Sequence, residues 1–110
     1  MITHDGTSVP RLSEPWDPNG TEWLTLAWDE DVACHGAITA SSWVLPDNWT
    51  NNFENEDVSV TDCDNNTYDH CNRVLLSTTE TSGLFVITNR VSFSDQTQLD
   101  RSVRIRIKEI

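Results

Sequence analysis

The clearest pattern of hydrophobic and polar positions lies at the carboxyl end of the sequence. In residues 103–108 each apolar residue is followed by a basic one: Val103, Ile105 and Ile107 alternate with Arg104, Arg106 and Lys108. A period of two predicts a strand with one buried face and one solvent-exposed face. Residues 84–93 keep a similar parity, interrupted only by Asn89. The short polar linker 94–98 predicts that these two strands form an antiparallel hairpin.

Shorter patterns of the same kind predict four earlier strands, at residues 23–28, 37–45, 57–61 and 73–77. Turn-forming residues separate them, including an acidic turn at 29–31 and a polar loop at 62–72, and no segment shows a helical period. Strands at such intervals are typical of an all-β fold, and specifically of a β-sandwich. The predicted core includes Trp28, Trp43, Phe85, Ile87, Val103 and Ile105.

Residues 1–20 differ from the rest in composition and predict an extended N-terminal arm before a single domain at 21–110. The arm is polar, with four isolated apolar residues, Ile2, Val9, Leu12 and Trp16. Such a segment cannot form its own core, so it packs either on its own domain or on another subunit. The start of the sequence has neither a basic nor an apolar leader segment, which predicts that no signal peptide is present.

The net charge of −11 over 110 residues is unevenly distributed. Residues 1–89 hold two basic and 15 acidic residues, a charge of −13, whereas residues 90–110 hold five basic and three acidic residues, a charge of +2. An acidic surface repels nucleic acid and anionic membranes, so we expect neither as a partner. The basic stripe on the last strand is either a solvated face or a contact with an acidic neighbour, which could be another copy of the chain.

The order of the strand motifs resembles that of a family of small immunoglobulin-like phage proteins, described as fibre–tail adaptors or virion structural proteins. The resemblance covers residues 22–109. It rests on the motifs ITASSWVLP at 38–46, VLLS at 74–77, GLFVITNRV at 83–91 and DRSV at 100–103. It implies an immunoglobulin-like β-sandwich that works in a virion, is made in the host cytoplasm and has no catalytic role. Three features depart from the family pattern: the turn at 78–83 keeps one glycine where two are common, Gln96 stands where a turn glycine is usual, and the insert at 63–71 is additional.

The cysteines and acidic residues of the polar loop are the main candidates for other chemistry. Cys63 and Cys71 are candidates for a disulfide bridge, with two free thiols as the alternative. The opening of the loop copies that of an EF-hand, but Thr67 and Arg73 replace the required glycine and glutamate. A looser calcium site at Asp62, Asp64 and Asp69 and a solvated acidic loop both remain open.

Zinc and nucleophilic catalysis are disfavoured by spacing. The cysteines and histidines contain no CxxC or HxxxH unit, so we expect no metal or other cofactor. Cys34 and His35 are adjacent and would point to opposite faces of a strand, and Cys63 with His70 offers only part of a dyad. We therefore expect no enzyme.

The sequence thus predicts a non-enzymatic virion protein that binds capsid, neck or tail proteins, or itself, as a fibre–tail adaptor or head decoration protein. The alternative is a soluble carbohydrate-binding or adhesion module, which would need an exposed aromatic platform. Exposed tryptophan is a common interface anchor, so Trp49 is a candidate as well as Trp16. The candidate interface residues are Ile2, Val9, Leu12, Trp16, Trp49, Arg104, Arg106 and Lys108.

Overall fold

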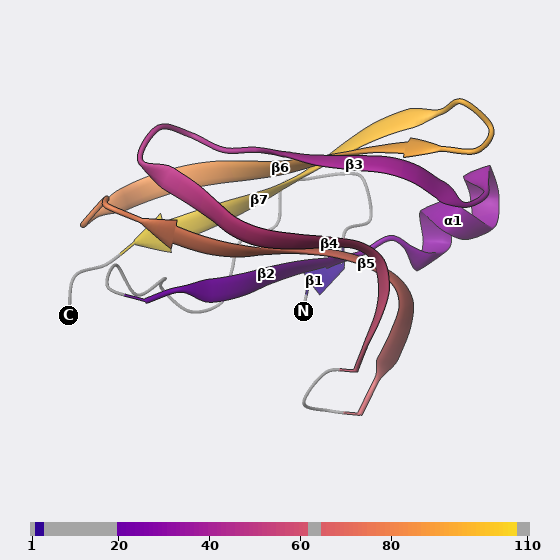
Figure 1. Ribbon diagram of the computed structural model, residues 1–110, viewed down its shortest axis with the longest axis horizontal. Helices are drawn as coiled ribbons and strands as arrows, with labels where there is room; N and C mark the ends of the chain where they lie inside the picture. Colours follow the sequence, from indigo (N-terminus) through magenta and orange to yellow (C-terminus); the bar gives the residue numbers. More distant parts are fainter. Residues whose placement is uncertain (1, 4–19, 62–64, 108–110) are drawn as a thin grey trace.

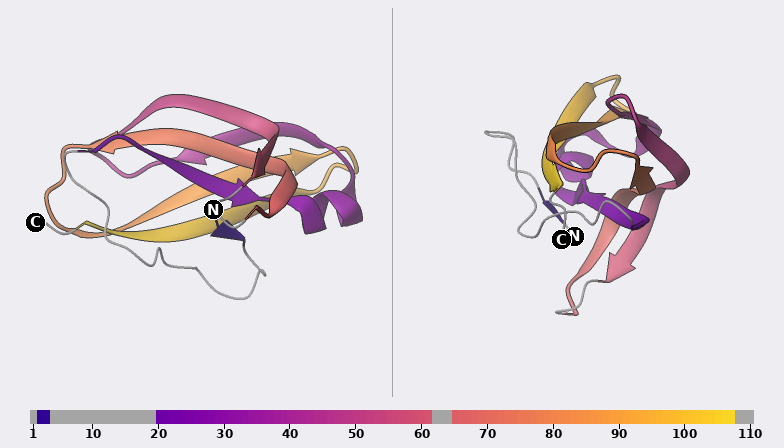
Figure 2. Two further views of the ribbon diagram at one scale, coloured as in Figure 1. Left: turned by 90° about the horizontal axis from the view of Figure 1, so that it is seen from below. Right: turned by 90° about the vertical axis from the view of Figure 1, so that its left-hand side faces the viewer.

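The computed structural model is an all-β protein of two facing sheets (Figures 1 and 2). It describes residues 2–3, 20–61 and 65–107. The first sheet has the order β1-β2-β5-β4 and the second the order β3-β6-β7. The strands are β1 (Ile2–Thr3), β2 (Glu22–Ala27), β3 (Ile38–Val44), β4 (Trp49–Thr61), β5 (Thr67–Thr78), β6 (Gly83–Phe93) and β7 (Gln98–Ile107). All pairs are antiparallel except β1 with β2.

The core lies between the two sheets, on the faces that the alternation predicted. One sheet contributes Leu24, Leu26, Val74 and Leu76, with Trp28 following β2, and the other contributes Ile87, Val91, Phe93, Val103, Ile105 and Ile107. Four of the six predicted core residues are therefore fully buried. Trp43 and Phe85 are only partly buried and pack against the edge of the core, which corrects the prediction for those two.

The predicted C-terminal hairpin is confirmed. Strands β6 and β7 pair from Gly83 with Ile107 to Ser92 with Gln98. The turn is closed by the Phe93 N–H, which donates to the Thr97 carbonyl at 2.8 Å, and by the Gln96 N–H, which donates to the Phe93 carbonyl at 3.0 Å. Gln96 has a φ of 73°, the left-handed region that glycine adopts most readily. A glutamine thus takes the conformation for which a turn glycine is otherwise used.

A short helix, α1 (Asp29–His35), occupies the segment predicted as an acidic turn. Its first turn holds three acidic residues and its last turn a histidine, both favourable to the helix dipole. The helix ends at Gly36, which has a φ of 93° and where an added Cβ would collide with the Ser94 side chain. The prediction of no helix was wrong because seven residues are too few to show a helical period.

Strands β4 and β5 are longer than the sequence pattern indicated. The loop predicted at 62–72 is already strand from Thr67, and β4 begins at Trp49 rather than at residue 57. Both strands bend away from the two layers, and their far ends project as a separate hairpin (Figure 1). Register shifts between Asn55 and Val58 mark a bulge at the bend, where Asp57 has a φ of 52°. Alternation of apolar and polar residues predicts only strands that place one face on the core, so it does not predict strand segments that extend beyond the core.

Asn89 interrupts the apolar parity of β6 and yet lies fully buried between the sheets. Its Oδ1 accepts hydrogen bonds from Trp28 Nε1 and Asn72 Nδ2, both at 2.9 Å. Its Nδ2 donates to Ser41 Oγ and to the Ser42 carbonyl, again at 2.9 Å. All four hydrogen-bonding positions of the amide are therefore used, and they join β6 to β3, to β5 and to the start of α1.

We expect Asn89→Ala to lower the free energy of unfolding by about 2–4 kcal/mol, because it leaves the buried Trp28 and Asn72 donors without their acceptor. Urea denaturation with Asn51→Ala as the matched control measures this. Asn51 is exposed, and its substitution should change stability by less than about 0.5 kcal/mol. Equal effects of the two substitutions would contradict a stabilising role for the buried amide.

Candidate binding surfaces

The outer face of the β3-β6-β7 sheet carries exposed apolar and cationic side chains together. We call this surface the basic face and define it by Val44, Leu84, Val86, Arg104 and Arg106. Cross-strand pairing places Leu84 beside Arg106 and Val86 beside Arg104. Leu84 and Val86 are 54% and 48% exposed, so half of each apolar side chain faces solvent. This is the solvent-exposed side of the strand predicted from the alternation at 103–108.

The two arginines of the basic face differ from the other cations of this sheet. Arg90 pairs with Asp100 at 3.0 Å, and Arg101 pairs with Asp31 at 2.8 Å. Arg104 and Arg106, by contrast, form no ion pair among the residues that the structure describes. Their positive charge is therefore available to a partner, on a protein whose net charge is strongly negative.

The outer face of the opposite sheet carries a second surface, which we call the aromatic face and define by Trp23, Phe53, Arg73 and Leu75. Trp23 and Phe53 both pair in register with Leu75, so the three form one row across β2, β5 and β4. The two rings are 6.2 Å apart and edge-to-face, and are 41% and 57% exposed. The Arg73 guanidinium lies 4.3 Å from the Trp23 ring centroid, and its Nε donates to Asn55 Oδ1 at 2.9 Å.

The aromatic face was not predicted, although Trp23 is the first residue of the strand predicted at 23–28. The parity of β2 assigns Leu24, Leu26 and Trp28 to the core and therefore Trp23 to the outside, which was the available signal. Phe53 could not be placed because its strand was not predicted. The sequence thus indicated the outward position of Trp23 but not that of Phe53.

The other predicted interface residues have different outcomes. Trp49 is buried against Phe85 in the core, with ring centroids 5.6 Å apart, so it caps the core and is not an exposed anchor. Strand β1 pairs the backbone of Ile2 with that of Leu26. Val9, Leu12, Trp16 and Lys108 lie outside the described residues and stay predictions.

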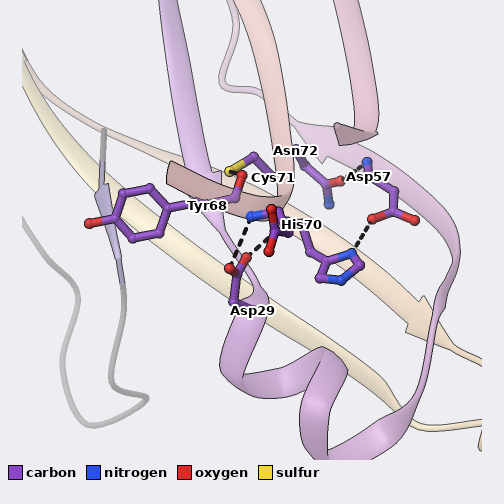
Figure 3. A network of polar contacts seen from close by, with 7 residues as sticks. Asp29, Asp57, Tyr68, His70, Cys71 and Asn72 are labelled. Carbon is purple, nitrogen blue, oxygen red and sulfur yellow. Dashed lines mark hydrogen bonds and ion pairs between the residues drawn. The ribbon is translucent and has the colours of Figure 1, made fainter. Parts of the chain in front are cut away.

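A polar cluster holds the bend of β4 and β5 against α1 (Figure 3). Asp29, the first residue of α1, accepts hydrogen bonds on its two carboxylate oxygens from the backbone N–H groups of Asp69 and His70, at 3.0 and 2.9 Å. The Asp57 N–H donates to Asn72 Oδ1 at 2.9 Å, which connects the bulge to the buried amides. The bend is thereby fixed by directed hydrogen bonds and not by apolar packing alone.

Asp57 and His70 form an ion pair across this bend. His70 Nδ1 lies 2.6 Å from Asp57 Oδ1. The hydrogen bond to Asp57 raises the pKa of His70, and the negative charges of Asp57, Asp29 and Asp69 act in the same direction, against a smaller loss from desolvation. The neighbouring Cys71 points away from this pair: its Sγ lies 3.7 Å from the Tyr68 carbonyl, and burial raises the pKa of its thiol to about 11. The thiol is therefore protonated and poorly nucleophilic at neutral pH.

The predicted cysteine and metal chemistry is only partly within the described residues. Cys63, Asp62 and Asp64 lie outside them, so the Cys63–Cys71 bridge and the calcium site stay predictions. Cys34 is exposed on α1, and His35 Nδ1 lies 2.9 Å from Asp95 Oδ2 in the β6–β7 turn. In the part of the chain that is described, no three histidine, cysteine or acidic residues gather as metal ligands would.

Comparison with known proteins finds no matching family model, curated protein or solved structure. In the described ranges, no helix has the length and apolar character needed to cross a membrane.

The stability contributed by the His70–Asp57 pair should depend on pH. Because the folded-state pKa of His70 is raised above its ordinary value of 6.5, the contribution is fully present below about pH 6.5 and is lost as the pH rises through the folded-state value. Asp57→Asn removes the carboxylate that contributes most to the raised pKa of His70. It keeps the left-handed backbone conformation of residue 57, which asparagine tolerates. The variant should therefore be less stable than wild type at pH 5.5 by up to about 1 kcal/mol, and nearly equal at pH 8.5.

Thermal melts at the two pH values measure this difference, with Glu56→Gln as the control. Glu56 is an exposed acidic residue on the same strand and is not among the charges that raise the pKa of His70, so its loss should give a stability difference that does not change between these pH values. If the wild-type protein became more stable relative to Asp57→Asn as the pH rises, the stabilising ion pair between protonated His70 and Asp57 would be contradicted.

Proposed function

We propose that this chain is a non-enzymatic structural protein of a tailed phage virion, which binds other virion proteins as a fibre–tail adaptor or head decoration protein. The observation that carries the proposal is the basic face, where Arg104 and Arg106, which form no ion pair with any described residue, stand beside exposed Leu84 and Val86. Apolar side chains next to uncompensated charge are typical of surfaces that bind a partner of opposite charge.

We further infer that the fold is immunoglobulin-like. The sheet orders β1-β2-β5-β4 and β3-β6-β7 correspond to the orders ABED and CFG of the seven-stranded immunoglobulin sandwich. The parallel pairing of β1 with β2 is a difference, because the first two strands of that sandwich run antiparallel. The strand order supports the immunoglobulin-like part of the inferred fold.

An adaptor must hold two partners at once, and the two binding surfaces lie on opposite sheets. The basic face belongs to β3, β6 and β7, whereas the aromatic face belongs to β2, β4 and β5. The core separates them, so a partner on one face leaves the other accessible (Figure 2). This arrangement favours a bridging role over a single contact.

Reversing the charge of Arg104 and Arg106 should abolish incorporation into particles. The double variant R104E/R106E changes the net charge from −11 to −15. Both side chains lie on the outer face, so the fold should stay intact. The measurement is the copy number of the variant in gradient-purified particles, and we expect a loss of at least about tenfold, because each reversal replaces attraction by repulsion at the contact.

The matched control carries the same net charge but leaves the basic face unchanged. It replaces four exposed polar residues at one end of the molecule by glutamate, at Thr50, Thr79, Thr81 and Ser82. Normal incorporation of R104E/R106E would overturn the proposal. Loss of incorporation in both variants would assign the effect to net charge and would overturn it as well.

The aromatic face favours a second candidate function, a soluble carbohydrate-binding or adhesion module. An exposed indole with amide and guanidinium groups beside it offers an apolar surface and hydrogen-bonding groups to a sugar ring. In affinity electrophoresis through gels containing soluble polysaccharides, Trp23→Ala should then abolish retardation while R104E/R106E retains it. Absence of retardation of the wild-type protein on every polysaccharide tested would count against this function.

A further inference from the structure

A groove at the edge of the molecule away from β7 complements the basic face in charge. It lies between β3 and β4, the edge strands of the two sheets on that side, and has a volume of about 280 Å³. Its lining includes Ser41, Glu54 and Glu56. Neither glutamate forms an ion pair among the described residues, so the groove is negative and uncompensated, as the basic face is positive and uncompensated.

The two surfaces also match in the number of their charges. Glu54 and Glu56 are two residues apart on β4, and Arg104 and Arg106 are two residues apart on β7. Side chains two residues apart on a strand lie on the same face and are separated by about 6.6–6.8 Å. That spacing applies to Arg104 and Arg106 on β7. On β4, Glu56 lies within the bulge between Asn55 and Val58, but Glu54 and Glu56 both line the groove. Two carboxylates that line one groove can thus face two guanidinium groups of one sheet face when two copies meet.

From this complementarity we propose that the partner of the basic face is a second copy of this chain, which presents its Glu54–Glu56 groove to Arg104 and Arg106. The proposal rests on the proposed function in that it takes the basic face to be a docking surface. It adds the identity of the partner, and it predicts contact chemistry that can be tested on the purified protein without particles.

The contact joins two different surfaces and is therefore head-to-tail. Strand β7 is the edge of its sheet away from β3, whereas the groove lies at the β3 and β4 edges. Each copy keeps one free basic face or one free groove after docking, so further copies add in the same orientation and form a ring or a row. A ring or row of identical subunits is an arrangement that a symmetric particle can use.

Electrostatics limits the conditions under which copies associate. The net charge of −11 on each copy opposes association at long range, but at physiological ionic strength charges more than about 8 Å apart are largely screened. Ion pairs at the contact are closer than this and still attract. At about 1 M salt, where screening acts over about 3 Å, the contact should weaken.

Charge exchange tests the pairing directly, with sedimentation of the purified protein over a range of concentrations as the measurement. Wild-type protein should self-associate, and R104E/R106E and E54K/E56K alone should each weaken association by at least about tenfold. A chain carrying all four substitutions should regain association, because both partners are exchanged. An equimolar mixture of the two double variants should associate too, since each supplies the surface that the other lacks.

Control variants keep these outcomes specific. Replacing Thr50, Thr79, Thr81 and Ser82 by lysine gives the same net charge as E54K/E56K, −7, and should leave association unchanged. Circular dichroism and urea unfolding verify that every variant is folded. Wild-type protein that stays monomeric at all concentrations would overturn the self-docking proposal, as would a folded four-substitution chain that does not associate.

The outcome also separates this proposal from the proposed function. If the protein is monomeric but R104E/R106E is still lost from particles, the basic face binds a different virion protein and only the identity of the partner is overturned. If the protein self-associates through these residues but R104E/R106E is incorporated normally, the head-to-tail contact is supported. The role of the basic face in incorporation into particles is then overturned.

Discussion

The buried carboxamide of Asn89 is the interaction on which the arrangement of this protein depends. It is enclosed between two sheets in a position that alternation reserves for an apolar side chain, and it is tolerated there because all of its donors and acceptors are used. Directed bonds to β3, β5 and the indole of Trp28 fix how the sheets face each other, which apolar packing alone specifies less sharply. A misaligned pair of sheets would leave several buried polar groups unpaired at once.

The same network determines where the chain leaves the core. Asn72 donates to Asn89 and accepts from the backbone of Asp57, so the bulge that bends β4 is attached to the centre of the molecule. Asp29 then joins the start of α1 to the backbone of β5, and the pair of His70 with Asp57 spans the bend. The helix, the bend and the projecting hairpin are thus one connected polar structure at one end of the two sheets (Figures 1 and 3).

Among the described residues, this construction places side chains on the outer faces of both sheets that the core does not use. One presents arginine and aliphatic side chains, and the other presents an aromatic pair held by Arg73. Neither set belongs to the buried hydrophobic core, whose residues lie on the inner faces. The side chains of the outer faces can therefore be changed without loss of the fold, which allows the proposed binding role to be tested by substitution.

The sequence by itself determined what depends on local alternation. The terminal hairpin, the buried faces of β2 and β7 and the outward position of Arg104 and Arg106 follow from a period of two, because each strand pairs over one continuous core. Tertiary structure alone decided the rest. The helix is too short to show a helical period. Trp49 lies at the start of β4, in a part of that strand which the pattern did not predict. The hydrogen-bond partners of Asn89 come from residues 17 to 61 positions away in the sequence. Trp23 and Phe53 come together because β2 and β4 both pair with β5 at Leu75. Glu54 and Glu56 line a groove because the edges of the two sheets lie side by side there. Such contacts are set by how sheets pack on each other, and no window of local sequence contains that information.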